Sequence, residues 1–235
     1  MSSKRNLHLL KDTLVYNLKI VFGNKFIYFL IAAVAFYLMV ISIMLWDDST
    51  VREHAIFDAL LFPGVLIIFY PIIFSIQNDK DARMLEIVFG VPNYRYKVYL
   101  VRFVITILLL FIIMLLLTWF AEFALVNIRI FYTVYHIMYP MLFIACLSFF
   151  FASWVKNANS AAVIMIAIGL IFFIMSEPLE ESKWNLFLNP INTPTDLSMT
   201  VWQKIVNQNR LMLVVGAVVA LLGSLINLQH REKFV

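Results

Sequence analysis

Residues 26–46 read FIYFLIAAVAFYLMVISIMLW, an apolar stretch without a single charged residue. About twenty residues in a helix, at roughly 1.5 Å each, cross the roughly 30 Å hydrocarbon core of a membrane. Five further stretches of similar character follow, at 55–76, 98–126, 132–154, 161–176 and 211–228. The sequence therefore predicts an all-α, polytopic membrane protein with six transmembrane helices in a single domain, 1–235.

The composition of the whole chain agrees with a lipid environment. Of its 235 residues, 63% are hydrophobic and 14% are charged, against about half and about a quarter in soluble domains. A soluble fold of this size would leave large apolar patches in water. The net charge of +4 comes from basic residues that flank apolar stretches. No long basic patch forms, and we expect no nucleic acid partner.

The distribution of Lys and Arg predicts the orientation. Thirteen of the 18 fall on the side of the two termini and five on the other side. Because basic loops resist translocation, we expect both termini in the cytoplasm and the chain in the inner membrane. Residues 1–25 show no cleavable signal. Their leucines recur at three- and four-residue spacing, which predicts an amphipathic interfacial helix on membrane lipid.

The connection 77–97 predicts a short amphipathic helix at the cytoplasmic surface. Asn78 suits its cap, Asp79 and Asp81 suit the positive end of its dipole, and Pro92 follows its end. Its apolar face is flanked by charges, as is typical of a helix that fits a partner's groove. The residues concerned are Arg83, Met84, Leu85, Glu86, Val88 and Phe89.

The run 93–102 after this helix alternates aromatic and basic residues and includes Tyr99 and Arg102. Tyrosine suits the headgroup region, and Arg and Lys extend their charged ends toward it. The run therefore predicts an interfacial anchor that leads into the third span.

The loop resembles that of the type 2 permease subunits of ABC exporters. Members of that family carry an acidic stretch, then Leu-Glu, then Pro and a basic or aromatic turn between their second and third spans. The span count and Asn189-Pro190 before the last span extend the resemblance. In the loop itself, Arg83-Met84 stands where many members have Gly-Thr. The matching residues are Asp79, Asp81, Arg83, Leu85, Glu86, Pro92, Tyr94, Arg95 and Lys97.

The resemblance implies that helix 77–89 couples this chain to a separate ATPase subunit, present in two copies. No Gly-Lys phosphate-binding loop occurs in the sequence, so ATP and Mg would be bound by that partner. We expect no cofactor and no catalysis in this chain, and a second copy or a related permease beside it. The predicted function is export of an amphipathic or lipid-like molecule, a drug or a peptide.

Three alternatives stay open. A permease-like anchor that couples ATP hydrolysis to an extracytoplasmic machine would have the same architecture. An ion-coupled carrier would need paired repeats and midplane charges, and an intramembrane enzyme a nucleophile with a base or a metal. The sequence shows no such arrangement. Its lone Cys146 and four scattered histidines predict no metal site.

Three features of the spans carry further predictions. Asp58 and Glu122 are candidates for a substrate pathway, because a carboxylate inside a bilayer is costly, or else they lie near the headgroups. Residues 177–210 predict two short helices that re-enter the membrane from outside before the last span. Small residues in that span predict a helix contact; they are Gly216, Ala220 and Ser224.

Overall fold

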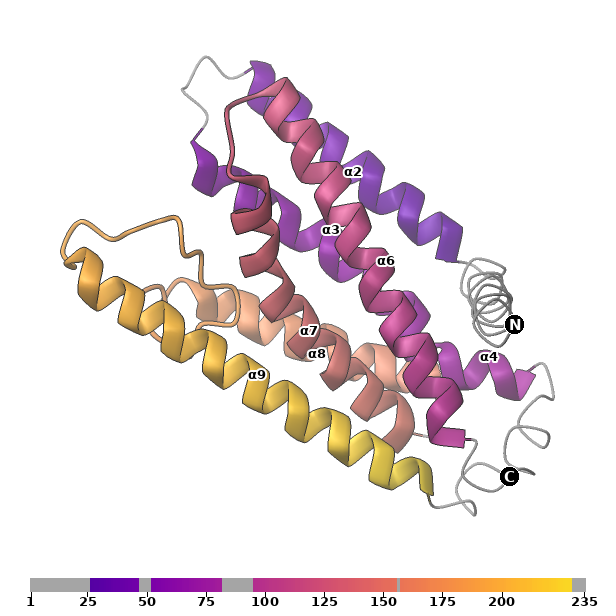
Figure 1. Ribbon diagram of the computed structural model, residues 1–235. Helices are drawn as coiled ribbons and strands as arrows, with labels where there is room; N and C mark the ends of the chain where they lie inside the picture. The colour runs from indigo at the N-terminus through magenta and orange to yellow at the C-terminus, as the bar shows by residue number, and fades with distance from the viewer. Residues whose placement is uncertain (1–25, 47–51, 82–94, 156, 230–235) are drawn as a thin grey trace, which may run out of the picture.

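The computed structural model describes residues 26–46, 52–81, 95–155 and 157–229, with the backbone alone at 80, 81, 95 and 96. This part of the chain is all-helical and contains no strand (Figure 1). Six of its helices are long and apolar enough to cross a membrane, as predicted. The helices are α2 (Phe26–Trp46), α3 (Glu53–Ile73), α4 (Ser75–Asp81), α6 (Arg95–Ala124), α7 (Ile130–Trp154), α8 (Ala158–Ser176) and α9 (Met199–Gln229).

The helix bounds match the prediction closely at the start of the chain and poorly near its end. Helix α2 coincides with the predicted stretch 26–46, whereas α9 begins at Met199 and not at 211. Residues 177–198 form turns without a helix. The prediction of two short helices before the last span is therefore wrong. The predicted interfacial helix 1–25 lies outside the described residues.

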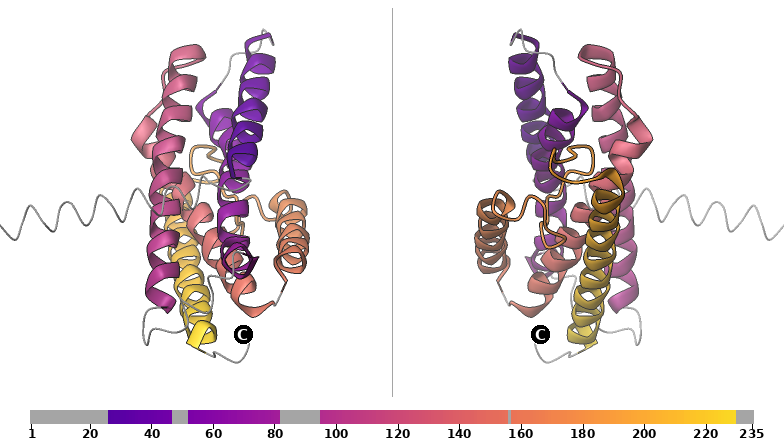
Figure 2. Two further views of the ribbon diagram at one scale, coloured as in Figure 1. Left: turned by 90° about the vertical axis from the view of Figure 1, so that its right-hand side faces the viewer. Right: turned by 90° about the vertical axis from the view of Figure 1, so that its left-hand side faces the viewer.

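Helix α7 lies at the centre of the bundle. It packs against α3, α6, α8 and α9, while α2 packs mainly against α3. Helix α8 stands on one side (Figure 2). The core between these helices is built from fully buried apolar side chains such as Tyr37, Ile67, Leu110 and Met141. Because α7 lies at the centre, a larger share of its residues is buried than in α2 or α8.

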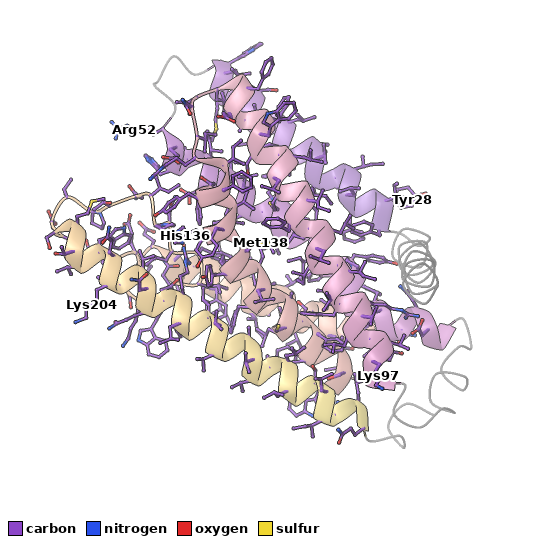
Figure 3. All side chains as sticks on the ribbon, in the orientation of Figure 1. Tyr28, Arg52, Lys97, His136, Met138 and Lys204 are labelled. Atoms are coloured by element: carbon purple, nitrogen blue, oxygen red, sulfur yellow. The ribbon has the colours of Figure 1, made fainter. Side chains whose placement is uncertain are left out.

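The bundle has two distinct ends (Figure 1). Helix α4, the start of α6 and the final turns of α7 and α9 lie at one end, which we call the α4 end. Residues 177–198 and the starts of α7 and α9 lie at the opposite end, which we call the segment end. Figure 3 shows Lys97 at the α4 end and Arg52 and Lys204 at the segment end.

Helices α7 and α9 run parallel and interlock through two aromatic rings. A Cβ at Gly216 would lie 2.6 Å from the Phe143 ring, and a Cβ at Gly223 would lie 2.9 Å from the Phe150 ring. The contact thus repeats after the same interval on both helices. A side chain at either position would force the ring to shift, so glycine allows the closest approach of the two helices. Since Ala220 and Ser224 are also buried, the predicted contact through small residues is confirmed.

Exposed aromatic residues mark both ends of the bundle. Trp46, Trp119 and Phe123 are exposed toward the segment end, and Tyr28 and Trp154 toward the α4 end. Trp and Tyr favour the two interfaces of a membrane. Tyr28 and Trp46 lie roughly 27 Å apart along α2 at 1.5 Å per residue, close to the thickness of the hydrocarbon core. The exposed apolar faces between these positions suit contact with lipid.

Candidate functional site

The predicted coupling loop starts on α4, which continues from α3 after a turn at Phe74. Asp79 lies on α4 and is only 5% exposed. Its carboxylate accepts a hydrogen bond from Arg102 Nη1 at 2.5 Å, which forms a buried ion pair. The first acidic residue of the loop is thus tied to the span that follows the loop.

Helix α6 presents the cationic partner on a buried face. Tyr99, Arg102 and Thr106 follow one another at three- and four-residue intervals, so they share one side of the helix, and all are buried. The Arg102 guanidinium carbon lies 5.8 Å from the centre of the Tyr99 ring. Thr106 Oγ1 donates to the Arg102 carbonyl at 2.9 Å. We call Asp79, Tyr99 and Arg102 together the α4 joint.

The α4 joint connects the two helices that border the loop. Two opposite charges removed from water attract strongly, but their desolvation cancels much of that gain. Loss of one partner alone is costly, at about 3–5 kcal/mol, because the other charge stays buried. The ion pair therefore fixes where α4 sits against α6 more than it adds net stability.

The structure describes only part of the predicted coupling site. Asp79 points into the bundle and contacts Arg102. At Asp81 and Arg95 the backbone is described, and residues 83–92 lie outside the described residues. The latter hold Arg83, Met84, Leu85, Glu86, Val88, Phe89 and Pro92. Contact of these residues with an ATPase stays a prediction.

Sequence reasoning missed the role of Tyr99 and Arg102. It placed both in an interfacial anchor, whereas Tyr99 is 1% and Arg102 7% exposed. Lys97 is exposed, as an anchor requires. A usable signal was present, because an arginine inside an apolar helix needs a buried partner. Asp79, near the start of the loop, is an acidic residue at the same end of the bundle and could supply that partner.

A second polar cluster lies at the segment end, between α7 and α9 (Figure 3, near His136). Arg210 is 5% exposed and donates from Nε to His136 Nδ1 at 3.3 Å and from Nη2 to the Leu188 carbonyl at 3.0 Å. Its Nη1 donates to Asn209 Oδ1 at 2.8 Å. Among the described residues it forms no ion pair. We call Arg210, Asn209 and His136 the Arg210 cluster.

Asparagine side chains fasten residues 177–198 to the bundle. Asn209 Nδ2 donates to the Lys183 and Asn185 carbonyls at 2.8 and 2.7 Å. Asn189 Nδ2 donates to the His54 carbonyl and to Asp58 Oδ1, both at 2.9 Å. These bonds join α9 and α3 to a segment that has no helix of its own. They also explain why α9 continues through polar residues where the sequence predicted an interruption.

The two candidate pathway residues, Asp58 and Glu122, have different surroundings. Asp58 is exposed and bonded to Asn189. Glu122 is half-buried on α6 and makes no hydrogen bond or ion pair within the described part of the chain. Arg129, a nearby basic residue, contacts Glu53 at 3.4 Å. The structure therefore does not bring Asp58 and Glu122 into one polar site.

Among the residues that the structure describes, no group of three His, Cys, Asp or Glu side chains comes close enough together to hold a metal. Cys146 is buried in the core. Comparisons of this chain with models of known protein families, with curated proteins and with solved structures find no match.

Proposed function

We propose that this chain is the membrane-spanning permease subunit of an ATP-driven exporter of the ABC type 2 family. The observation that carries the proposal is the α4 joint, where Asp79 at the start of the loop pairs with Arg102 beyond its end. The loop sequence that resembles the family lies between these two anchored points. A partner that moves the loop would therefore displace α3 and α6 together.

In this proposal the ATPase binds at the α4 end. The predicted helix 77–89 would enter its groove, with the apolar residues Met84 and Leu85 as the contact and Arg83 and Glu86 as charged neighbours. The ATPase, in two copies, holds ATP and Mg, and a second permease copy or a related permease completes the transporter. Both termini and the α4 end face the cytoplasm of an inner membrane.

Purification tests the partner directly. The tagged chain, extracted in mild detergent from its own cells, should bring down an ATPase with a phosphate-binding loop, identified by mass spectrometry. In proteoliposomes, Glu86→Ala and deletion of 84–85 should abolish the effect of this permease on ATP hydrolysis while membrane insertion stays normal. Glu181→Ala is the matched control, because Glu181 is an exposed acid at the segment end. Normal coupling in both loop variants would refute the docking site.

Thiol labelling tests the orientation. In a Cys146→Ala background, a membrane-impermeant reagent should label Lys204→Cys from outside intact cells. It should label Lys97→Cys only after the membrane is permeabilised. Lys97 and Lys204 are both exposed and lie at opposite ends of the bundle. Labelling of position 97 from outside would reverse the orientation and exclude a cytoplasmic ATPase at the α4 end.

One observation favours a second candidate, an anchor for an extracytoplasmic machine. Residues 177–198 are held in a defined shape by asparagine bonds, and they expose Trp184, Glu177 and Glu181. A fixed surface of this kind suits contact with another protein. The same purification decides between the two functions, because an additional envelope protein in the complex would favour the anchor.

A further inference from the structure

Arg210 carries a positive charge that no ion pair balances within the described part of the chain. Its three nitrogens donate to neutral acceptors, which are a backbone carbonyl, an amide oxygen and an imidazole nitrogen. Because His136 accepts its bond at Nδ1, the imidazole is neutral and adds no charge. Buried charges in proteins are normally paired, and Arg210 is only 5% exposed. The Arg210 cluster therefore lacks one negative charge.

The acidic residues of α3 and of residues 177–198 do not supply this charge. Glu53 pairs with Arg129. Asp58 and Glu180 each accept a hydrogen bond from an asparagine side chain. None of the three forms an ion pair with Arg210 in the described structure. A bound anion would provide the charge that the cluster lacks.

Two tyrosines of α7 connect Arg210 to the surface of the bundle. The Arg210 guanidinium carbon lies 5.6 Å from the centre of the Tyr139 ring. The Tyr139 hydroxyl donates a hydrogen bond to the Tyr135 hydroxyl, and Tyr135 is 55% exposed. Because the Tyr135 oxygen accepts that bond, its own hydrogen can be donated to an acceptor outside the chain. An anion at Tyr135 would thus gain a hydrogen bond close to an unbalanced cation.

An exposed apolar stripe begins next to Arg210 and runs along α9. It consists of Leu211, Val215, Val218 and Leu222, which recur at three- and four-residue intervals and are all exposed. At 1.5 Å per residue the stripe is roughly 16 Å long. One leaflet contributes about half of the roughly 30 Å hydrocarbon core. The stripe therefore has the length of one acyl chain, and the cation lies at its segment end.

We propose that the Arg210 cluster binds the phosphate group of an anionic phospholipid. The phosphate accepts a hydrogen bond from the Tyr135 hydroxyl and balances the charge of Arg210, while an acyl chain lies along the stripe at 211–222. Free phosphate offers the same oxyanion, but it has no apolar part to contact the stripe. This site goes beyond the proposed function, because lipid binding needs neither ATP nor an ATPase.

Native mass spectrometry of the purified full chain, titrated with lipid in detergent, tests the ligand. The wild type should bind phosphatidylglycerol about tenfold more tightly than phosphatidylcholine, because the two share a phosphate and acyl chains but only the first has a net negative charge. Inorganic phosphate should not displace the bound phosphatidylglycerol. Equal affinity for the two lipids overturns the charge-selective site. Displacement by inorganic phosphate overturns the phospholipid as the ligand.

Variants of the same chain test the location of the site. Arg210→Gln should abolish the preference for phosphatidylglycerol, because the cation is removed. Tyr135→Phe should weaken its binding by about tenfold, since a hydrogen bond to a charged group is lost, and this exposed position decides the test if Arg210→Gln does not fold. Arg129→Gln is the matched control, because Arg129 is an exposed arginine at the same end that already pairs with Glu53. Wild-type binding in Tyr135→Phe, or a lost preference in Arg129→Gln, overturns the site.

Discussion

The α4 joint and the Arg210 cluster each bury an arginine in an apolar bundle, and they stabilise it in opposite ways. Arg102 has a carboxylate partner at 2.5 Å but leaves Nε without a bond. Arg210 has no ion pair among the described residues, yet each of its three nitrogens donates a hydrogen bond. One site balances its charge, and the other satisfies its donors.

This difference decides how each site holds the segments around it. An ion pair depends mainly on the distance between the charges, so its partners can exchange bonds within a small space. Hydrogen bonds to backbone carbonyls depend on both distance and direction. The Arg210 cluster therefore holds residues 177–198 in one position. The α4 joint holds α4 against α6 through the single bond between Asp79 and Arg102.

The largest expected effect is on the free energy of unfolding, and it comes from removing the cation of the α4 joint. Arg102→Met leaves the Asp79 carboxylate buried without a cation, and we expect a loss of about 3–5 kcal/mol in the free energy of unfolding. Denaturation in detergent micelles measures this. The double variant Asp79→Leu with Arg102→Met should recover most of the loss, because no buried charge remains. An Arg102→Met protein as stable as the wild type would show that the pair is exposed to water in the membrane.

The next effect concerns hydrogen bonds without a charge partner. Arg210→Met removes the donors to the Leu188 carbonyl and to His136, and we expect a loss of about 2–4 kcal/mol, since each buried group left unbonded costs about 1–3 kcal/mol. Residues 177–198 should then be cleaved faster by added protease, whereas Arg102→Met should leave their cleavage unchanged. Equal cleavage in Arg210→Met and the wild type would contradict a fixing role.

Helices α7 and α9 run between the segment end and the α4 end. A change at the contact between them should have a smaller effect on stability. Gly216→Ala places a methyl group 2.6 Å from the Phe143 ring, and overpacking of this kind costs about 1–3 kcal/mol. Adding Phe143→Leu should restore stability. Gly169→Ala on α8 is the control, because no atom lies within 4 Å of that position. Helix propensity should make it more stable by up to about 1 kcal/mol. A destabilised Gly169→Ala would contradict the exposed placement of α8.

The fold was predictable because lipid imposes a simple rule. Every crossing helix needs about twenty apolar residues, so the composition of α2 alone fixed its bounds at Phe26 and Trp46. The start of α9 was not predictable in this way. Asn209 and Arg210 look like residues of the loop before a span. They lie inside a helix because their side chains donate hydrogen bonds to the carbonyls of residues 183, 185 and 188.

Only one member of the ion pair in the candidate site, Asp79, was predictable from the sequence. Asp79 stood out because an acidic residue at a helix start has a local reason, the helix dipole. Its actual partner is Arg102, and no local pattern relates two residues on different helices. A small cavity beside Tyr99 likewise depends on how α3, α6 and α7 pack. Such features come from packing, which hydrophobic periodicity does not describe.

The smallest expected effect comes from the exposed ion pair of Glu53 and Arg129, which tests whether burial causes the difference between the arginine sites. Arg129 is 65% exposed at its side chain, and the contact measures 3.4 Å. Exposed pairs contribute about 0.2–1 kcal/mol and weaken in salt. Glu53→Gln should therefore lower the free energy of unfolding by that amount at low ionic strength and by less at high ionic strength. A loss as large as that of Arg102→Met would mean that proximity of charges, and not their removal from water, sets the energy of these sites.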